Sequence, residues 1–347
     1  MKYKLLAVSK SPKLSRINIG DYVQALASSQ FLPQVDGFID RDEDLKDYSG
    51  EPCKVIMNGW YMHNPKNWPP TEKIIPLFVA FHINSEAKKE LLSPSSKAYL
   101  KSHQPIGCRD LNTMELLTKN GIEAYFSGCM TLTLGKKYYS KEKKTTTYIV
   151  DPLYNGSLKG WNIFRAIYET LLHPFEIFKL CRTKGLYLYS GRNILNKYIK
   201  TALYYKEYTR IFDRKIIMES IYISQGSRHQ EKCKSNQKLL EEAEHLVKLY
   251  STAQLVITSR IHCALPCLGI ETPVIYIENG QDVETSLCRM GGLRELFNII
   301  TIDKGVLIPQ FDTTLPITAS NHPMNKDSWK VLAQKMIRKC TEFIATK

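Results

Sequence analysis

The sequence predicts an α/β protein with two doubly wound, Rossmann-like domains that face one another across a cleft. Apolar segments of strand length alternate with amphipathic helical segments twice along the chain. A basic, weakly patterned stretch at 135–145 separates the two runs. The 347 residues also exceed what one hydrophobic core usually serves. We expect an N-terminal domain at 1–140, a C-terminal domain at 141–325, and a helical segment at 326–347 that packs back on the first domain.

The first run supplies the elements of the N-terminal domain. An apolar stripe through Val23, Leu26 and Phe31 marks its first helix, and Asp110 can cap a later helix that stops before Gly121. Short apolar runs between these helices, several of them closed by Gly or Asn, are typical of buried parallel strands. The expected strands are 3–8, 54–57, 74–81, 106–108 and 122–126, and the expected helices are 19–31, 85–92 and 110–121.

The second run resumes after the linker and contains one long insert. Its clearest element is an amphipathic helix in which Leu239, Ala243, Leu246 and Tyr250 share a stripe. A tyrosine-rich, basic segment at 160–215 is expected to be helical. The other expected elements are strands at 147–150, 216–223, 255–257, 273–277 and 299–302, and helices at 236–250, 261–268 and 328–346.

The formal charge of +14 is concentrated in part of the insert. Residues 176–215 hold ten Lys/Arg against three acids, a net of 10 − 3 = +7, interleaved with tyrosines. Such a surface suits an anionic substrate or anionic lipid, although a solvated helical face would have the same composition. No nucleic-acid-binding module accompanies it, so we expect no DNA or RNA partner.

Targeting and cysteine patterns indicate a cytoplasmic protein. No apolar run reaches 18 residues, and the apolar start of the chain is too short for a signal peptide. The nine cysteines include no Cys-x-x-Cys pair, which favours free thiols in a reducing compartment. Cys263 and Cys267 lie four residues apart on one helix face, where we expect them to pack rather than to bind zinc.

The most informative segment is 254–262, where a short apolar strand runs into a helix. Ser259, Arg260 and His262 lie at this junction. Ligands of open α/β sheets bind outside the carboxyl ends of the strands, and the first amides of the next helix attract anions. The junction therefore predicts a site for a phosphorylated or carboxylated ligand with a proton donor beside it.

Two further loops place polar residues at strand ends. The first contains Asn18, Gly20 and Asp21, which offer polar contacts, a close backbone approach to a ligand, or simply a helix cap. In the second, Arg109 precedes Asp110, and this arginine either faces the cleft or pairs with that acid at the surface.

Together these motifs resemble the polysaccharide pyruvyl transferase family over roughly residues 15–305. The resemblance rests on Asn-x-Gly-Asp at 18–21, Arg-Asp at 109–110, Ser-Arg-Ile-His at 259–262, and Thr-Pro-Val-Ile at 272–275. The segments Asn-Gly-Trp at 58–60, Phe-His at 81–82 and Phe-Ser-Gly-Cys at 126–129 are similar to the form found in bacterial gene clusters for surface polysaccharides. Ser-Arg-Ile-His is the specific part, and the insert at 160–215 matches nothing in the family pattern.

The resemblance implies a GT-B-like fold and a cytoplasmic transferase of capsule or exopolysaccharide biosynthesis. Its donor would be phosphoenolpyruvate, with no cofactor and no metal, and it would place a pyruvate ketal on a sugar, free or lipid-diphosphate-linked. The donor would lie on the C-terminal domain and the acceptor on the N-terminal domain. His262 would be the general acid, its pKa raised by bound anions, and Asp21 or Asp151 the base. The expected ligand contacts are Ser259, Arg260, Arg109, Asn18, Gly20 and His229.

Three alternatives remain open from the sequence. A GT-B-type glycosyltransferase that uses a nucleotide sugar would share the fold and the cationic junction. A non-enzymatic basic module could bind acidic polysaccharide or anionic membrane, and a degenerate enzyme could keep the fold for assembly. Independently of these, the basic, tyrosine-bearing insert suggests peripheral contact with the inner membrane face.

Overall fold

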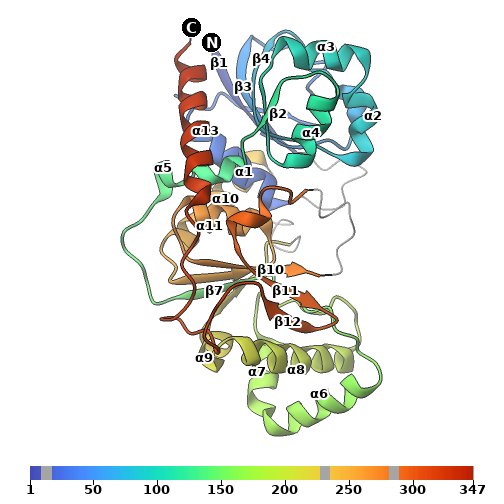
Figure 1. Ribbon diagram of the computed structural model, residues 1–347, viewed down its shortest axis with the longest axis vertical. Coiled ribbons are helices and arrows are strands. Elements are labelled where there is room, and N and C mark those ends of the chain that lie inside the picture. The colour runs from blue at the N-terminus through green and yellow to red at the C-terminus, as the bar shows by residue number, and fades with distance from the viewer. Residues whose placement is uncertain (9–17, 227–234, 281–288, 347) are drawn as a thin grey trace.

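The computed structural model describes residues 1–8, 18–226, 235–280 and 289–346 (Figure 1). It is a mixed α/β protein built on two six-stranded sheets, as the alternation of segments predicts. All strand pairs but one are parallel. The exception is the antiparallel pair at one edge of the second sheet.

The first sheet has the order β2-β1-β3-β4-β5-β6. Its strands and helices agree with the predicted ones except in three places. Strand β2 and helix α3 are too short or too polar to show a clear pattern, and β3 does not stop at 57 but runs through Asn58 and Gly59 to Tyr61, with a shift of register between Met57 and Gly59. Asp110 caps α4 as expected, since its carboxylate accepts the Thr113 amide at 2.9 Å. The elements are β1 (Lys2–Ala7), α1 (Ile19–Ser29), β2 (Phe38–Asp40), β3 (Cys53–Tyr61), β4 (Ile74–Ile83), α2 (Lys88–Leu91), α3 (Pro94–Ser102), β5 (Ile106–Cys108), α4 (Leu111–Lys119) and β6 (Ala124–Phe126).

The second sheet has the order β12-β11-β10-β9-β7-β8. Between the sheets, the chain passes through η3 (Met130–Thr133) and α5 (Gly135–Tyr138), so the expected linker is partly helical. The remaining elements are β7 (Thr147–Val150), α6 (Trp161–Leu172), α7 (Pro174–Arg182), α8 (Ile194–Ile211), α9 (Arg214–Glu219), β8 (Ile221–Ile223), α10 (Asn236–Ser251), β9 (Leu255–Thr258), α11 (Ile261–Gly269), β10 (Val274–Asn279), η5 (Arg294–Leu296), β11 (Asn298–Asp303), β12 (Val306–Pro309) and α13 (Ser328–Ala345).

The predicted strand at 216–223 is wrong over most of its length. Residues up to Glu219 form α9, and only Ile221–Ile223 pair as β8. The Asp213 carboxylate accepts the Lys215 amide at 2.8 Å and caps α9, so the apolar pair Ile216–Ile217 packs from a helix instead of a strand. The helix cap at Asp213 therefore outweighs the strand preference of the β-branched residues in this segment.

Helices α1, α10 and α11 lie between the two sheets (Figure 1). One apolar core joins Val23 and Leu26 of α1 to Leu246 of α10 and Leu265 of α11. The expected domain boundaries, and a cleft between two separate domains, stay predictions. A second core lies on the other face of the second sheet, beneath α7 and α8.

Helix α13 packs back on the first half of the chain, as predicted. It lies against η3, α11 and β4 and buries Trp329, Met336 and Cys340. The Lys54 ammonium of β3 donates to the Phe343 carbonyl at 2.6 Å, which joins the end of the helix to the first sheet. Among the helices within the described residues, none combines the length and the apolarity needed to cross a bilayer.

Candidate functional site

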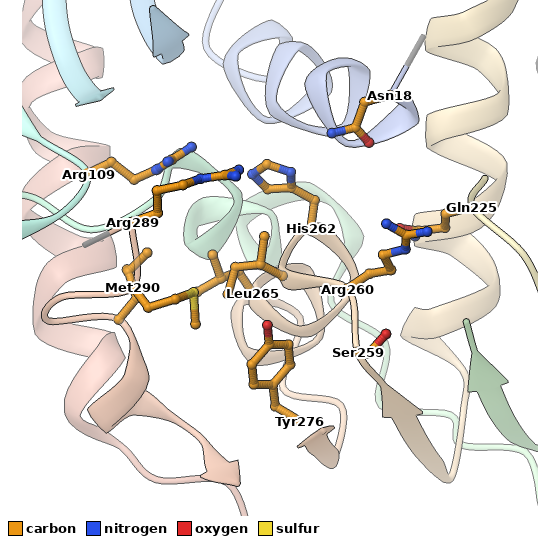
Figure 2. A pocket seen from close by; sticks show the side chains of 12 residues that line it. Asn18, Arg109, Gln225, Ser259, Arg260, His262, Leu265, Tyr276, Arg289 and Met290 are labelled. Atoms are coloured by element: carbon orange, nitrogen blue, oxygen red, sulfur yellow. The ribbon is translucent and has the colours of Figure 1, made fainter. Parts of the chain in front are cut away.

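A cavity of about 200 Å³ lies at the carboxyl ends of β5, β8 and β9, where the start of α1 also approaches (Figure 2). Because one water takes about 30 Å³ in the liquid, this cavity admits a small organic ligand. Strand ends are where ligands bind in parallel α/β sheets. The lining residues are Asn18, Arg109, Gln225, Ser259, Arg260, Ile261, His262, Leu265, Tyr276, Arg289, Met290 and Leu293.

The junction of β9 and α11 is held by Asp151, which follows β7. Arg260 Nε donates to the Asp151 carboxylate at 2.8 Å, and the backbone N–H of Gln225 donates to the same oxygen at 3.0 Å. The Ser259 hydroxyl donates to the Asp151 carbonyl at 2.6 Å. Asp151 therefore orients three lining residues. The hydroxyl hydrogen of Ser259 is already used, which leaves its oxygen only as an acceptor in this conformation.

His262 lies in the first turn of α11 and is buried, with 7% of its surface exposed. Its Nε2 atom is fully enclosed and has no hydrogen-bond partner within the described residues. Burial, together with the nearby Arg109 and Arg289, lowers the pKa of His262 from 6.5 to about 3. The imidazole is therefore neutral in the empty site, whereas the sequence suggests a raised pKa once anions are bound.

Arg109 and Arg289 point their guanidinium groups toward the His262 ring (Figure 2). Arg109 is 3% exposed, and its buried Nε has no hydrogen-bond partner among the described residues. Its close counter-charge is the Asp110 carboxylate, at 4.0 Å from Nε. Burial lowers the pKa of Arg109, a group that stays charged at any ordinary pH. Arg289 adds a second cation on the same side of the His262 ring (Figure 2).

Behind Arg109, His82 and Asp110 form a buried pair. His82 Nδ1 lies 2.6 Å from the Asp110 carboxylate and 3.2 Å from the Thr113 hydroxyl. Burial and the charge of Arg109 lower the pKa of His82 to about 4 despite the hydrogen bond to Asp110. The neutral ring therefore donates to Asp110, which stays ionised and faces Arg109.

The start of α1 supports the cavity from above. The Asn18 side chain accepts the Gly20 amide at 3.0 Å, so Asn18 caps α1 and also lines the cavity. A Cβ atom on Gly20 would lie 2.5 Å from His262 Nδ1. The glycine that we expected to admit a ligand instead makes room for the catalytic candidate His262.

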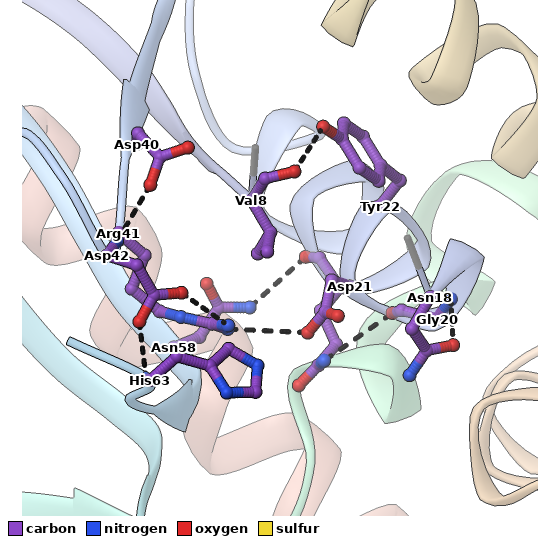
Figure 3. A network of polar contacts seen from close by, with 11 residues as sticks. Val8, Asn18, Gly20, Asp21, Tyr22, Asp40, Arg41, Asp42, Asn58 and His63 are labelled. Atoms are coloured by element: carbon purple, nitrogen blue, oxygen red, sulfur yellow. Dashed lines mark hydrogen bonds and ion pairs between the residues drawn. The ribbon is translucent and has the colours of Figure 1, made fainter. Parts of the chain in front are cut away.

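Asp21 belongs to a separate polar network at the ends of β2 and β3 (Figure 3). Its carboxylate accepts Arg41 at 3.3 Å, and Arg41 also pairs with Asp42 at 3.4 Å. The guanidinium of Arg41 lies over the Trp60 ring, 5.6 Å from its centroid, and Trp60 packs against His63. Asp21 does not line the cavity, although it lies one helical turn from residues that do.

Five of the expected site residues line one cavity: Asn18, Arg109, Ser259, Arg260 and His262. Gly20 and Asp151 contact lining residues, and His229 lies outside the described residues. The sequence analysis missed Gln225, Tyr276 and Arg289. Gln225 follows β8 directly and the strand-end rule points to it, but Arg289 lies in a segment without a recognisable motif.

A comparison with protein-family models supports the resemblance of the motifs. A family model described as polysaccharide pyruvyl transferase matches residues 18–281, which contain all of the lining residues up to Tyr276. No curated protein matches the chain. A solved structure of a functionally uncharacterised protein from Klebsiella pneumoniae is similar to it at 12% identity and a TM-score of 0.44, covering 87% of this chain and 92% of that one. Because this family model matches most of the length of the chain, the chain belongs to the polysaccharide pyruvyl transferase family.

Proposed function

We propose that the protein transfers the pyruvate of phosphoenolpyruvate to two hydroxyls of a sugar, free or as a lipid-linked precursor, as a cyclic ketal. Family membership supports a transferase that acts on polysaccharide. The main support for phosphoenolpyruvate as the donor comes from the cavity. Two arginines there point toward the buried imidazole of His262, whose Nε2 has no hydrogen-bond partner within the described residues.

The charges of the cavity suit a ligand with two anionic groups. Arg109 and Arg289 lie on one side of His262, and Arg260 lies on the other (Figure 2). Guanidinium groups bind phosphate and carboxylate oxygens bidentately. Phosphoenolpyruvate carries both anions on one short carbon frame, so each can meet its own arginine, while the first amides of α11 add a partial positive charge.

Donor binding would change the protonation of His262. In the empty site, burial and two cations keep the ring neutral. A bound dianion would offset the charges of Arg109 and Arg289, and it would raise the pKa of His262 toward neutrality. The acid would therefore form mainly when the donor is present, which limits loss of its proton to solvent.

The reaction balances with His262 as a proton carrier. The imidazolium gives its proton to the methylene carbon, which becomes a methyl group, and the first sugar hydroxyl attacks the neighbouring carbon. Phosphate then leaves with the electron pair of its C–O bond, and the second hydroxyl closes the ketal. Of the two hydroxyl protons, one restores the acid and the other leaves with phosphate.

Asp21 fits the role of base better than Asp151. The Asp151 carboxylate already accepts Arg260 and the Gln225 amide through one oxygen and holds the β9–α11 junction in place. Asp21 pairs with Arg41 through Oδ1, and its Oδ2 accepts no hydrogen bond from any residue in the described ranges. The half-buried rings of Trp60 and His63 beside it suit the apolar face of a sugar, so we assign this network to the acceptor.

Phosphate release from phosphoenolpyruvate tests the proposal directly. A panel of galactose- and mannose-type acceptors should include one that makes release depend on both substrates and gives a product heavier by one pyruvate ketal. Calorimetric titration separates the glycosyltransferase alternative, since we expect binding of phosphoenolpyruvate but not of UDP- or CMP-sugars. Binding of a nucleotide sugar alone would overturn the donor assignment.

A further inference from the structure

Helices α6 and α7 turn their large apolar side chains toward solvent. Within each helix these residues are three or four positions apart, so each helix carries one exposed apolar stripe. Trp161 is 78% exposed, Leu171 76% and Phe175 85%. We name the two stripes together the α6–α7 apolar face, made of Trp161, Phe164, Tyr168, Leu171, Phe175 and Phe178.

Core packing does not explain this arrangement. A helix on the surface of a soluble protein normally buries its apolar stripe and exposes its polar side. In α6 the buried residues are Ala166 and Glu169, one small and one acidic. Helix α7 is attached more firmly, through Ile177, Leu180 and Cys181, and its aromatic residues still point outward. Exposed apolar patches of this extent usually mark an interaction surface.

The surroundings of the face are strongly cationic. Residues 159–197 contain seven Lys/Arg and two acids, a net of 7 − 2 = +5. Both acids are already neutralised by cations from outside this range: Glu169 pairs with Lys206 at 3.1 Å, and Glu176 pairs with Arg214. The seven cations, all exposed, are Lys159, Arg165, Lys179, Arg182, Lys184, Arg192 and Lys197.

We propose that the α6–α7 apolar face docks on an anionic lipid bilayer, with its aromatic side chains in the interfacial layer and the surrounding cations on lipid phosphates. Helices of this composition lie in the plane of a membrane surface, where Trp and Tyr prefer the headgroup level. Each cation near an anionic surface adds about 1 kcal/mol of attraction.

Charge favours lipid over a second copy of the chain. A symmetric dimer through this face would bring two surfaces of the same sign together, whereas anionic lipid supplies the opposite charge. Of the tyrosines of the insert, Tyr168 belongs to this face and is exposed. Tyr204, Tyr205 and Tyr208 are buried in α8, and the exposed residues belong mainly to α6 and α7.

Vesicle sedimentation with the full chain provides the first test. We expect binding to phosphatidylglycerol-containing vesicles that exceeds binding to phosphatidylcholine vesicles and weakens with salt. The double variant Trp161→Ser/Phe175→Ser should bind at least about tenfold less, equivalent to about 1.4 kcal/mol, because two aromatic side chains no longer enter the interfacial layer. The matched control is Met324→Ser/Val331→Ser, which removes two exposed apolar residues elsewhere and should bind normally.

The cations are tested separately. Arg165→Gln/Lys184→Gln should reduce binding to anionic vesicles several-fold and flatten its salt dependence. Lys141→Gln/Lys335→Gln, with the same change of net charge on exposed positions elsewhere, should leave binding nearly unchanged. An equal loss in both variants would show that only net charge matters and would overturn the assignment to this face.

Fluorescence locates the contact. Trp161 is far more exposed than Trp68 and Trp329, each 5% exposed. Anionic vesicles should shift its emission to the blue, brominated lipid should quench it, and Trp161→Phe should lose both effects. The proposal is overturned if Trp161→Ser/Phe175→Ser binds vesicles like the wild type. It is also overturned if sedimentation velocity shows a lipid-free dimer that this variant dissociates. The catalytic proposal is unaffected by either outcome, because phosphate release is measured without lipid.

Discussion

At the scale of single residues, His262 shows how position sets chemistry. A histidine in water is half protonated near its ordinary pKa of 6.5, but this one is enclosed and faces two guanidinium groups. With a pKa of about 3, the ring is unprotonated at neutral pH and has no imidazolium proton to give unless a bound anion raises its pKa. The same arginines that would bind the donor thus control when the proton becomes available.

His262→Ala should lower turnover in the phosphate-release assay by about 10²- to 10⁴-fold, the range for loss of a general acid. The donor KM should change much less, because the three arginines remain. His245→Ala is the matched control, since His245 is exposed on α10 away from the cavity. Turnover near the wild-type value in His262→Ala would remove this residue as the acid.

Arg260→Lys should raise the KM for phosphoenolpyruvate by about tenfold, equivalent to about 1.4 kcal/mol, because an ammonium cannot reproduce the bidentate fork. Arg294→Lys is a close control: Arg294 Nε also lies 2.8 Å from a carboxylate, that of Glu278, but this arginine does not line the cavity. An unchanged donor KM in Arg260→Lys would contradict the assignment.

At the scale of elements, the start of α1 has two functions in one turn. Asn18 caps the helix, and Gly20 leaves space for the His262 ring. The core between the sheets fixes α1 against α10 and α11, so the cap, the glycine and the imidazole keep their relative positions. The sequence predicts at least a helix cap for the loop at 18–21, and the structure shows that the same loop also forms part of the cavity around His262.

Asn18→Asp separates these two functions. Aspartate is as good a cap as asparagine, so unfolding free energy should stay within about 0.5 kcal/mol of the wild type. The new carboxylate faces the cavity and should raise the donor KM about tenfold by repelling an anion. Asn18→Ala should show the reverse, a stability loss of about 1 kcal/mol with little change in KM. A normal KM in Asn18→Asp would make Asn18 a cap and nothing more.

At the scale of the whole molecule, the burial of His262 makes the stability of the fold depend on pH. The folded protein keeps His262 neutral down to about pH 3, whereas the unfolded chain takes up a proton near pH 6.5. Between these values the unfolded state binds more protons. The contribution of His262 to stability is therefore complete above about pH 6.5 and is lost as the pH falls toward 3.

Urea unfolding at pH 7.5 and pH 5 measures this effect. The loss of unfolding free energy between the two pH values should be smaller in His262→Gln than in the wild type by about 2 kcal/mol, since glutamine does not titrate. His82→Gln should act in the same direction, because burial also lowers the pKa of His82. Identical pH dependence in the wild type and His262→Gln would show that the folded protein does not hold this ring neutral.

The sequence by itself determined the elements with strong local signals. Two runs of alternating strand and helix patterns predicted the two largely parallel sheets, and polar residues at strand ends identified five residues of one cavity. The family followed from the same motifs. Periodicity, caps and strand-to-helix junctions depend on neighbours in the chain, so they can be read without knowing the fold.

Tertiary structure alone decided how distant segments act on one another. It brought Arg109 and Arg289 to the same side of His262, made His262 neutral, and turned Gly20 toward an imidazole more than two hundred positions later. It also buried three of the four tyrosines of α8 and left the aromatic side of α6 in solvent. Burial and electrostatic potential arise from the sum of all packed segments, and no local pattern contains that sum.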